Sequence, residues 1–263
     1  MCGIAGYSLS KASRVGRTLA SQALLAGIAE RGADAVGYAY RCGEGPVMIR
    51  KQRSGASALL ERITVPDEAT QALLHVRDYT KGHPSISANN HPIRHGAVVG
   101  IHNGIIKNDE ELFAVQRIDR HETEMTVDSE IIFALAERSR GRTARTLEQL
   151  YGSMATAWLD ERRPELLLAR GMGRPLWIGR CENALFFAST KGALELLERY
   201  AGVTLRKREL GLGSLVAVRE GKVVAEEFFR PDLSFDEGTP LPAVRAPHEG
   251  ATCLAALASL AAA

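Results

Sequence analysis

The sequence contains no long hydrophobic run, since no apolar stretch approaches the roughly 20 residues that a membrane-spanning helix requires. Its first residues, MCGIAGYSLSK, lack the basic region and long apolar segment that are typical of a signal peptide. Charge of one sign is not in excess, because 33 lysines and arginines stand against 31 aspartates and glutamates. This balance does not favour a surface that binds nucleic acid or a membrane. We therefore expect a cytoplasmic protein with no nucleic-acid or membrane partner.

Cysteine is also sparse, with four residues and no C-x-x-C pair. No cysteine and histidine cluster has the spacing of a zinc site, and we expect no metal. Scattered single thiols suit a reducing compartment better than a disulfide framework. Hydrophobic residues make up 45% of the 263 residues and charged residues 24%, as in an ordinary globular protein.

Hydrophobic periodicity predicts more strands than helices. The predicted helices cover residues 18–30, 57–63, 109–113, 128–138 and 190–200, and short strands fill most of the remainder up to residue 228. Short turns between strands indicate antiparallel sheets, and the helices are placed to cover them. The polar segment 78–92 has no periodicity and is predicted to be a functional loop. From Pro231 onward prolines accumulate before an alanine-rich end, which indicates a linker or tail.

Cys2 is the most distinctive candidate for chemistry. Removal of Met1 would give one residue both a thiol and a free α-amine. Because the pKa of an α-amine is about 8 and that of a thiol about 8.5, the amine can accept the thiol proton near neutral pH. Taken alone, Cys2 fits an incidental cysteine better than a nucleophile.

Two further segments carry arginines. Arg31 and Gly32 end a predicted helix, where they fit either a simple helix stop or a site that needs close backbone approach. Arg77 ends a predicted buried strand, where a guanidinium requires a partner. It suits either a structural ion pair or bidentate binding of a carboxylate, such as that of a free amino acid.

Two more segments permit alternative readings. Asn103-Gly104 follows an apolar strand and fits either a hairpin turn or a pair of donors for an oxyanion. Asp128 stands at the start of a predicted helix, where it fits either an N-cap or a partner for a substrate ammonium. Taken alone, each segment favours the local role, which is the hairpin turn for Asn103-Gly104 and the N-cap for Asp128.

Taken in order, these segments resemble the class II glutamine amidotransferase domain, a family of N-terminal nucleophile hydrolases. The resemblance is greatest to the glutaminase half of glucosamine-6-phosphate synthase. The resemblance extends from Cys2 to about Phe229. It rests on six motifs in order: Cys2-Gly3-Ile4-Ala5-Gly6, Arg31-Gly32-x-Asp34, His75-x-Arg77-x-x-Thr80, Asn90-His91-Pro92, His102-Asn103-Gly104-Ile105-Ile106-x-Asn108 and Thr126-x-Asp128-Ser129-Glu130.

The resemblance implies an α+β fold, a four-layer α-β-β-α sandwich of two packed antiparallel sheets. It implies that Cys2 is the nucleophile and its α-amine the general base, with Asn103 and the Gly104 N–H as the oxyanion hole. Arg31 and Gly32 would shape the site, and no cofactor is implied. For glutamine, the resemblance implies three binding residues: Arg77 for the α-carboxylate, Asp128 for the α-ammonium, and Thr80 in the pocket lining.

The sequence departs from the synthase pattern at Asp78, where that family carries a tryptophan linked to communication with the acceptor site. We predict a glutaminase domain over 2–230 and a Pro/Ala-rich tail over 231–263. Only 33 residues follow Arg230, so we expect a separate ammonia-accepting synthase or transferase subunit. Two alternatives remain: hydrolysis of another small or γ-glutamyl amide, and a catalytically idle regulatory or scaffold domain.

Overall fold

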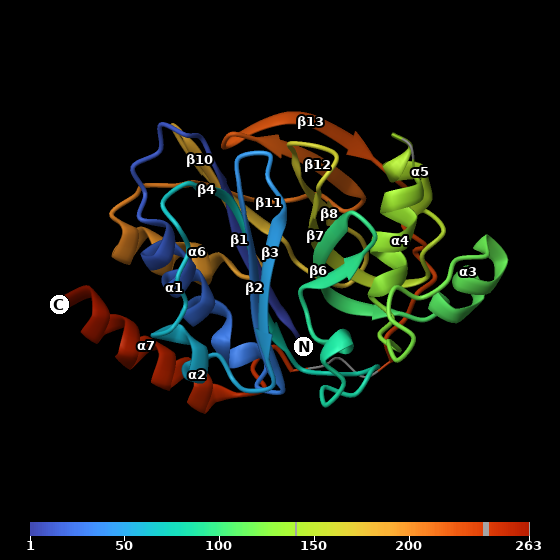
Figure 1. Ribbon diagram of the computed structural model, residues 1–263, viewed down its shortest axis with the longest axis horizontal. Helices are drawn as coiled ribbons and strands as arrows, with labels where there is room; N and C mark the ends of the chain where they lie inside the picture. The colour runs from blue at the N-terminus through green and yellow to red at the C-terminus, as the bar shows by residue number, and fades with distance from the viewer. Residues whose placement is uncertain (140, 239–241, 263) are drawn as a thin grey trace.

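The computed structural model describes residues 1–139, 141–238 and 242–262. Two antiparallel β-sheets pack face to face, and helices cover both outer faces (Figure 1). The seven-stranded sheet has the order β11 (Arg206–Glu209), β9 (Trp177–Cys181), β10 (Ala184–Ala188), β1 (Gly3–Leu9), β4 (Ala69–Arg77), β2 (Ala35–Cys42), β3 (Val47–Gln52). The six-stranded sheet has the order β13 (Lys222–Phe228), β12 (Ser214–Arg219), β8 (Leu166–Arg170), β7 (Gly152–Asp160), β6 (Val98–Ile106), β5 (Ile93–His95). The expected α-β-β-α sandwich is confirmed.

Each outer face has its own helical layer (Figure 1). The seven-stranded sheet is covered by α1 (Arg17–Ile28), α2 (Ser57–Leu60), α6 (Lys191–Ala201) and α7 (Pro247–Ala262), with the short 3-10 helix η1 (Ala29–Arg31) after α1. The six-stranded sheet is covered by α3 (Asp109–Gln116), α4 (Glu130–Arg138) and α5 (Thr143–Leu147). A third cluster of apolar side chains fills the space between the sheets. Burial of these three clusters from water stabilises the four layers against one another.

The five predicted helices all overlap helices in the structure, but three short or late elements were not predicted. These are β5, α5 and α7. The predicted tail ends in α7, whose Cys253 and Leu257 are fully buried in the cluster beneath α1. These two residues are four apart and therefore lie on one face of a helix, a pattern that the alanine-rich composition concealed.

The segment between Arg77 and β5 is irregular apart from the 3-10 helix η2 (Ser87–Asn89), in agreement with the predicted long loop. Among the residues described, no helix has the length and apolar character needed to cross a bilayer. The N-terminus lies between the two sheets, at the end where β1 begins (Figure 1). Arg77, at the end of β4, lies at the same end of the strands because β1 and β4 are antiparallel.

Candidate functional site

Cys2 lies directly before β1, and Arg77 and Asn103 lie in β4 and β6, so these strands place all three residues beside the space between the sheets. In the antiparallel pair β1–β4, Ile4 pairs with His75, and the same register places Cys2 opposite Arg77. Because side chains two residues apart share a face of a strand, Cys2 points to the same side as Ile4, which belongs to the cluster between the sheets. By the same rule, Asn103 of β6 shares a face with Ile101 of that cluster.

A hydrogen bond joins the two sheets at this point. Nε2 of His75 in β4 lies 3.1 Å from the carbonyl oxygen of His102 in β6, so the ring nitrogen donates to the residue next to Asn103. Burial lowers the pKa of His75 to about 3, which leaves the ring neutral at physiological pH. The neutral ring fixes the spacing between the strand of Arg77 and the strand of Asn103.

Cys2 is held by contacts to its side chain and to its backbone. Its Sγ lies 3.5 Å from the carbonyl oxygen of Asp78, and its own carbonyl oxygen accepts a hydrogen bond of 2.9 Å from Nε of Arg31. The ammonium group of Met1 forms an ion pair with the carboxylate of Asp78. Burial raises the pKa of the Cys2 thiol, and the Asp78 carbonyl and the Arg77 guanidinium oppose this rise. The thiol therefore needs a nearby base to become a thiolate at neutral pH.

The Arg31-Gly32 turn packs directly on the end of β4. A Cβ atom at Gly32 would lie 2.4 Å from the carbonyl oxygen of Arg77, so only glycine permits this approach. Two residues later, the N–H of Asp34 donates to the same carbonyl at 3.0 Å. The Asp34 carboxylate accepts a hydrogen bond of 2.9 Å from the N–H of Tyr79. The turn thus fixes the backbone that contacts the Cys2 sulfur.

Arg77 is buried without a salt-bridge partner among the described residues. Its guanidinium donates to Oδ1 of Asn90 at 2.6 Å and to the carbonyl oxygens of Lys81 and Gly82. The predicted alternative of a structural ion pair is therefore not what the structure contains. Burial lowers the pKa of Arg77, and charges on Cys2 and Asp128 oppose this effect. The guanidinium is held as a cation within electrostatic range of both groups.

Thr80 differs in exposure from the other predicted site residues. It is exposed in the segment that follows β4. A role in lining the substrate pocket remains a prediction for this residue.

Asn103 and Gly104 lie within β6 and do not form the hairpin turn that was one alternative. Both amide atoms of the Asn103 side chain are buried without a hydrogen-bond partner in the described part of the chain. Gly104 has a φ of 152°, and a Cβ atom there would lie 2.0 Å from the carbonyl oxygen of Ser153. A buried amide with free hydrogen-bonding capacity costs stability unless a ligand satisfies it.

Asp128 is not the side-chain cap of α4, which begins at Glu130. Its Oδ2 accepts a hydrogen bond of 2.7 Å from the N–H of Ile106 at the end of β6. Burial raises the pKa of the Asp128 carboxyl to about 6, and the Ile106 N–H opposes this rise. A buried carboxylate beside the Asn103-Gly104 strand can pair with a ligand cation.

The chain is similar in sequence and fold to several known proteins. A family model described as a glutamine amidotransferase domain matches residues 67–196. Glutamine–fructose-6-phosphate aminotransferase (isomerizing) of Escherichia coli O6:H1 is 33% identical over 206 residues, which cover 74% of this chain and 32% of that protein. The protein of the same name from Chlamydia trachomatis is 29% identical over 235 residues, which cover 85% of this chain and 36% of that protein.

The protein belongs to the class II glutamine amidotransferase family. The chain spans about a third of the length of these curated relatives. Glutamine phosphoribosylpyrophosphate amidotransferase from B. subtilis shares its fold, with a TM-score of 0.69 at 20% identity over 87% of this chain and 49% of that chain. The predicted family and sandwich are both confirmed.

The amidotransferase domain also contains supporting residues whose roles could not be predicted from local sequence patterns. Nδ1 of His102 lies 2.8 Å from Oγ of Ser129, which precedes α4. Asn90 holds the Arg77 guanidinium, and Asp34 holds the backbone after it. His102, Ser129, Asn90 and Asp34 all stand in the quoted motifs, but only the folded chain shows what they contact.

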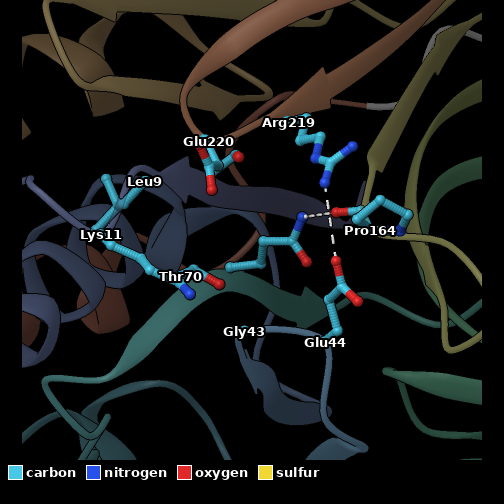
Figure 2. A pocket seen from close by; sticks show the side chains of 10 residues that line it. Leu9, Lys11, Gly43, Glu44, Thr70, Pro164, Arg219 and Glu220 are labelled. Atoms are coloured by element: carbon cyan, nitrogen blue, oxygen red, sulfur yellow. Dashed lines mark hydrogen bonds and ion pairs between the residues drawn. The ribbon is translucent and has the colours of Figure 1, made fainter.

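A cavity elsewhere in the amidotransferase domain lies at the opposite end of β1 from Cys2. Figure 2 shows Leu9 at the end of β1, Thr70 at the start of β4 and Glu44 in the β2–β3 turn around it. Arg219 reaches across the cavity to Glu44 at 3.8 Å. Because β1 and β4 are antiparallel, Leu9 and Thr70 are both remote from the Cys2 end of the sheet. This cavity is separate from the candidate site.

Replacing Asp128 with asparagine is expected to stabilise the amidotransferase domain at pH 7. An unfolded aspartate has a pKa near 3.9, whereas the folded value is about 6. The folded state therefore binds more protons between these values, and stability falls as pH rises from about 4 to 6. This penalty is at most about 3 kcal/mol and is constant above pH 6. Asparagine avoids it while its Oδ1 can still accept from Ile106.

Thermal unfolding of the wild-type protein and Asp128→Asn at pH 4 to 8 measures this effect. The difference in Tm is expected to be small at pH 4 and to grow until about pH 6. Asp160, which pairs with Arg162, offers a control because its pKa is lowered. Asp160→Asn should instead lose stability above pH 4. Equal destabilisation by both substitutions would contradict the raised pKa.

Proposed function

We propose that the chain hydrolyses the side-chain amide of glutamine with Cys2 and supplies the ammonia to a separate acceptor-modifying enzyme. The observation that carries this proposal is that Cys2 directly before β1, Arg77 at the end of β4 and Asn103 in β6 lie at one end of the space between the sheets. The glutamine amidotransferase family match and the names of the E. coli and Chlamydia relatives support the choice of glutamine.

The proposed reaction begins after removal of Met1. The free α-amine of Cys2 accepts the thiol proton, and the thiolate attacks the amide carbon of glutamine. Asn103 and the Gly104 N–H donate to the oxyanion of the tetrahedral intermediate. The C–N bond then breaks, and ammonia leaves with the proton that the amine had accepted. Water hydrolyses the thioester to glutamate and restores the thiol.

Substrate binding rests on opposite charges at the two ends of the site. Arg77 is a buried guanidinium whose present partners are neutral oxygens, so a ligand carboxylate can take their place. Asp128 offers a carboxylate for the α-ammonium of the same ligand. A free amino acid carries both charges, whereas an amide blocked at the α-position does not.

The purified protein is expected to begin at Cys2 and to release glutamate from glutamine. Intact-mass measurement determines whether Met1 has been removed, and an enzyme-coupled assay measures glutamate. A glutamine-analogue electrophile should label Cys2 in the same preparation, as peptide mapping would show. Retention of Met1 in a protein that still hydrolyses glutamine would contradict the mechanism.

Two comparisons test the alternatives. Glutamine with a blocked α-amine or α-carboxylate should be hydrolysed at least about tenfold more slowly than glutamine, because a lost charge-assisted contact costs about 1.5–3 kcal/mol. Faster turnover of the blocked compounds would favour a hydrolase of other γ-glutamyl amides. Absence of both labelling and turnover would favour a catalytically idle domain.

A further inference from the structure

Asp78 places a carboxylate next to the chain terminus, at the position where the synthase pattern carries tryptophan. Its side chain forms an ion pair with the ammonium of Met1, and its carbonyl oxygen accepts from the Cys2 sulfur at 3.5 Å. The same residue therefore contacts both the present terminal amine and the proposed nucleophile. Removal of Met1 transfers the free amine to the nitrogen of Cys2, which is the next residue along the chain.

The C-terminal segment brings a cation to the same carboxylate. Nε of Arg245 lies 3.2 Å from Oδ2 of Asp78. The N–H groups of Arg245 and Ala246 both donate to the carbonyl oxygen of Glu30 at 2.9 Å, immediately before Arg31. This part of the chain is thus fixed beside the nucleophile.

Helix α7 anchors the segment that carries Arg245. Near the start of α7, the Glu249 carboxylate accepts hydrogen bonds from the N–H of Ser57 at 2.8 Å and from its Oγ at 3.0 Å. Farther along, Leu257 is buried in the cluster beneath α1. Arg245 therefore lies just before a packed helix, and its backbone is paired with Glu30.

We infer that Asp78 is a positioning residue that holds the α-ammonium of mature Cys2, and that Arg245 weakens this hold. The inference rests on the proposed function and extends it to the control of the general base. A carboxylate within about 4–6 Å favours the charged form of an amine, whereas a nearby guanidinium disfavours it. The amine must lose its proton before it can accept one from the thiol. Asp78 and Arg245 therefore set, in opposite directions, the pH at which the nucleophile becomes active.

Other charged groups surround this amine from the elements packed against it. Arg77 at the end of β4 and Arg31 in η1 both disfavour an ammonium. The Asp34 carboxylate accepts a hydrogen bond from Tyr79, and the Cys2 thiol is neutral when protonated. Asp78 is the group that pairs with the terminal ammonium in the structure. Its removal should consequently have the largest effect on the amine.

The experiment measures the pH dependence of kcat/KM for glutamine in the full chain, for the wild type, Asp78→Asn and Arg245→Ala. The acid limb near the usual α-amine pKa of about 8 reports the amine, because only the neutral amine acts as a base, whereas protonation of Asp128 lowers the profile only near and below pH 6. Asp78→Asn should move this limb to lower pH by about one unit, and Arg245→Ala should move it to higher pH. Asp78→Glu should restore the limb toward the wild-type position. Acid limbs that coincide in all variants would overturn the inference.

Arg208→Ala serves as a matched control. Its guanidinium pairs with Glu226 at 3.2 Å and is 40% exposed, compared with 45% for Arg245. This variant should keep the wild-type acid limb. A purely structural role for Arg245 would lower the plateau of the profile and leave the limb in place, and that result would also overturn the inference.

A second measurement does not depend on turnover. In protein labelled with nitrogen-15 cysteine, the chemical shift of the Cys2 α-amine follows its titration directly. Its midpoint should fall in Asp78→Asn and rise in Arg245→Ala. These shifts without any glutamine hydrolysis would support the inference and refute the proposed function. Glutamine hydrolysis with an unchanged midpoint would support the proposed function and refute the inference. Retention of Met1 in an active protein would refute both the inference and the proposed function.

Discussion

Replacement of Cys2 by alanine is expected to abolish glutamine hydrolysis, with a loss of at least about 10³-fold in kcat/KM. The substitution removes the only atom that the mechanism uses to attack the amide carbon. It leaves the α-amine, because alanine is also small enough to follow a removable methionine. The remaining groups can bind glutamine and polarise its amide, but they offer no covalent route. Glutamate release under saturating glutamine measures the effect.

Two controls separate chemistry from folding. Cys2→Ala should unfold within a few degrees of the wild type, because Cys2 is only partly buried and its sulfur makes a single weak contact. Cys42→Ala removes an exposed thiol at the end of β2, remote from the site, and should keep full activity. Substantial activity in Cys2→Ala with an intact fold would eliminate Cys2 as the nucleophile.

The secondary structure could be predicted from local patterns, whereas strand pairing could not. Alternation and turn residues indicated most strands, and helical spacing indicated α1, α4 and α6. The central strand β1 pairs with β4 and with β10, which follow it by more than 60 and 170 residues. No local pattern encodes such a register, because it depends on which apolar faces fit together in the folded chain. Local patterns indicated antiparallel sheets covered by helices, but the four-layer order of two packed sheets came only from the family resemblance.

Local sequence was least informative where tertiary contacts override it. Asn-Gly ordinarily indicates a hairpin turn, but Asn103-Gly104 lies inside β6 and pairs with β7. Asp128 has the position of a helix cap but accepts a hydrogen bond from Ile106. In both cases a residue that usually serves local structure serves a neighbouring strand instead.

The contact between Arg245 and Asp78 was also beyond the reach of sequence reasoning. The two residues are separated by most of the chain, and Arg245 stands in a Pro-rich segment that was predicted to be a linker or tail. Its significance appears only once α7 is packed against η1 and α1. An exposed arginine in such a segment has no feature that distinguishes it from other surface charges.

Replacement of Asn103 by alanine is expected to lower kcat by about 10²- to 10³-fold, because one donor in an oxyanion hole contributes about 2.7–4 kcal/mol. KM should change little, since the oxyanion forms only in the transition state and the intermediate. The same substitution should not destabilise the fold. Both polar atoms of the Asn103 side chain are buried without partners among the described residues, so alanine removes an unsatisfied group.

Asn108, five residues later in the same motif, is a control because its side-chain amide has hydrogen-bond partners, unlike that of Asn103. Its side chain donates to the carbonyl oxygen of Gln149 at 2.9 Å and accepts from the N–H of Tyr151 at 2.9 Å. Asn108→Ala should therefore lower the Tm while kcat changes by less than about tenfold. If Asn103→Ala instead lost stability and kept its kcat, the amide would have a structural partner and no part in stabilising the oxyanion. A buried amide that lowers stability but raises kcat is expected of a preorganised oxyanion hole, because the negative charge that the amide stabilises develops only during the reaction.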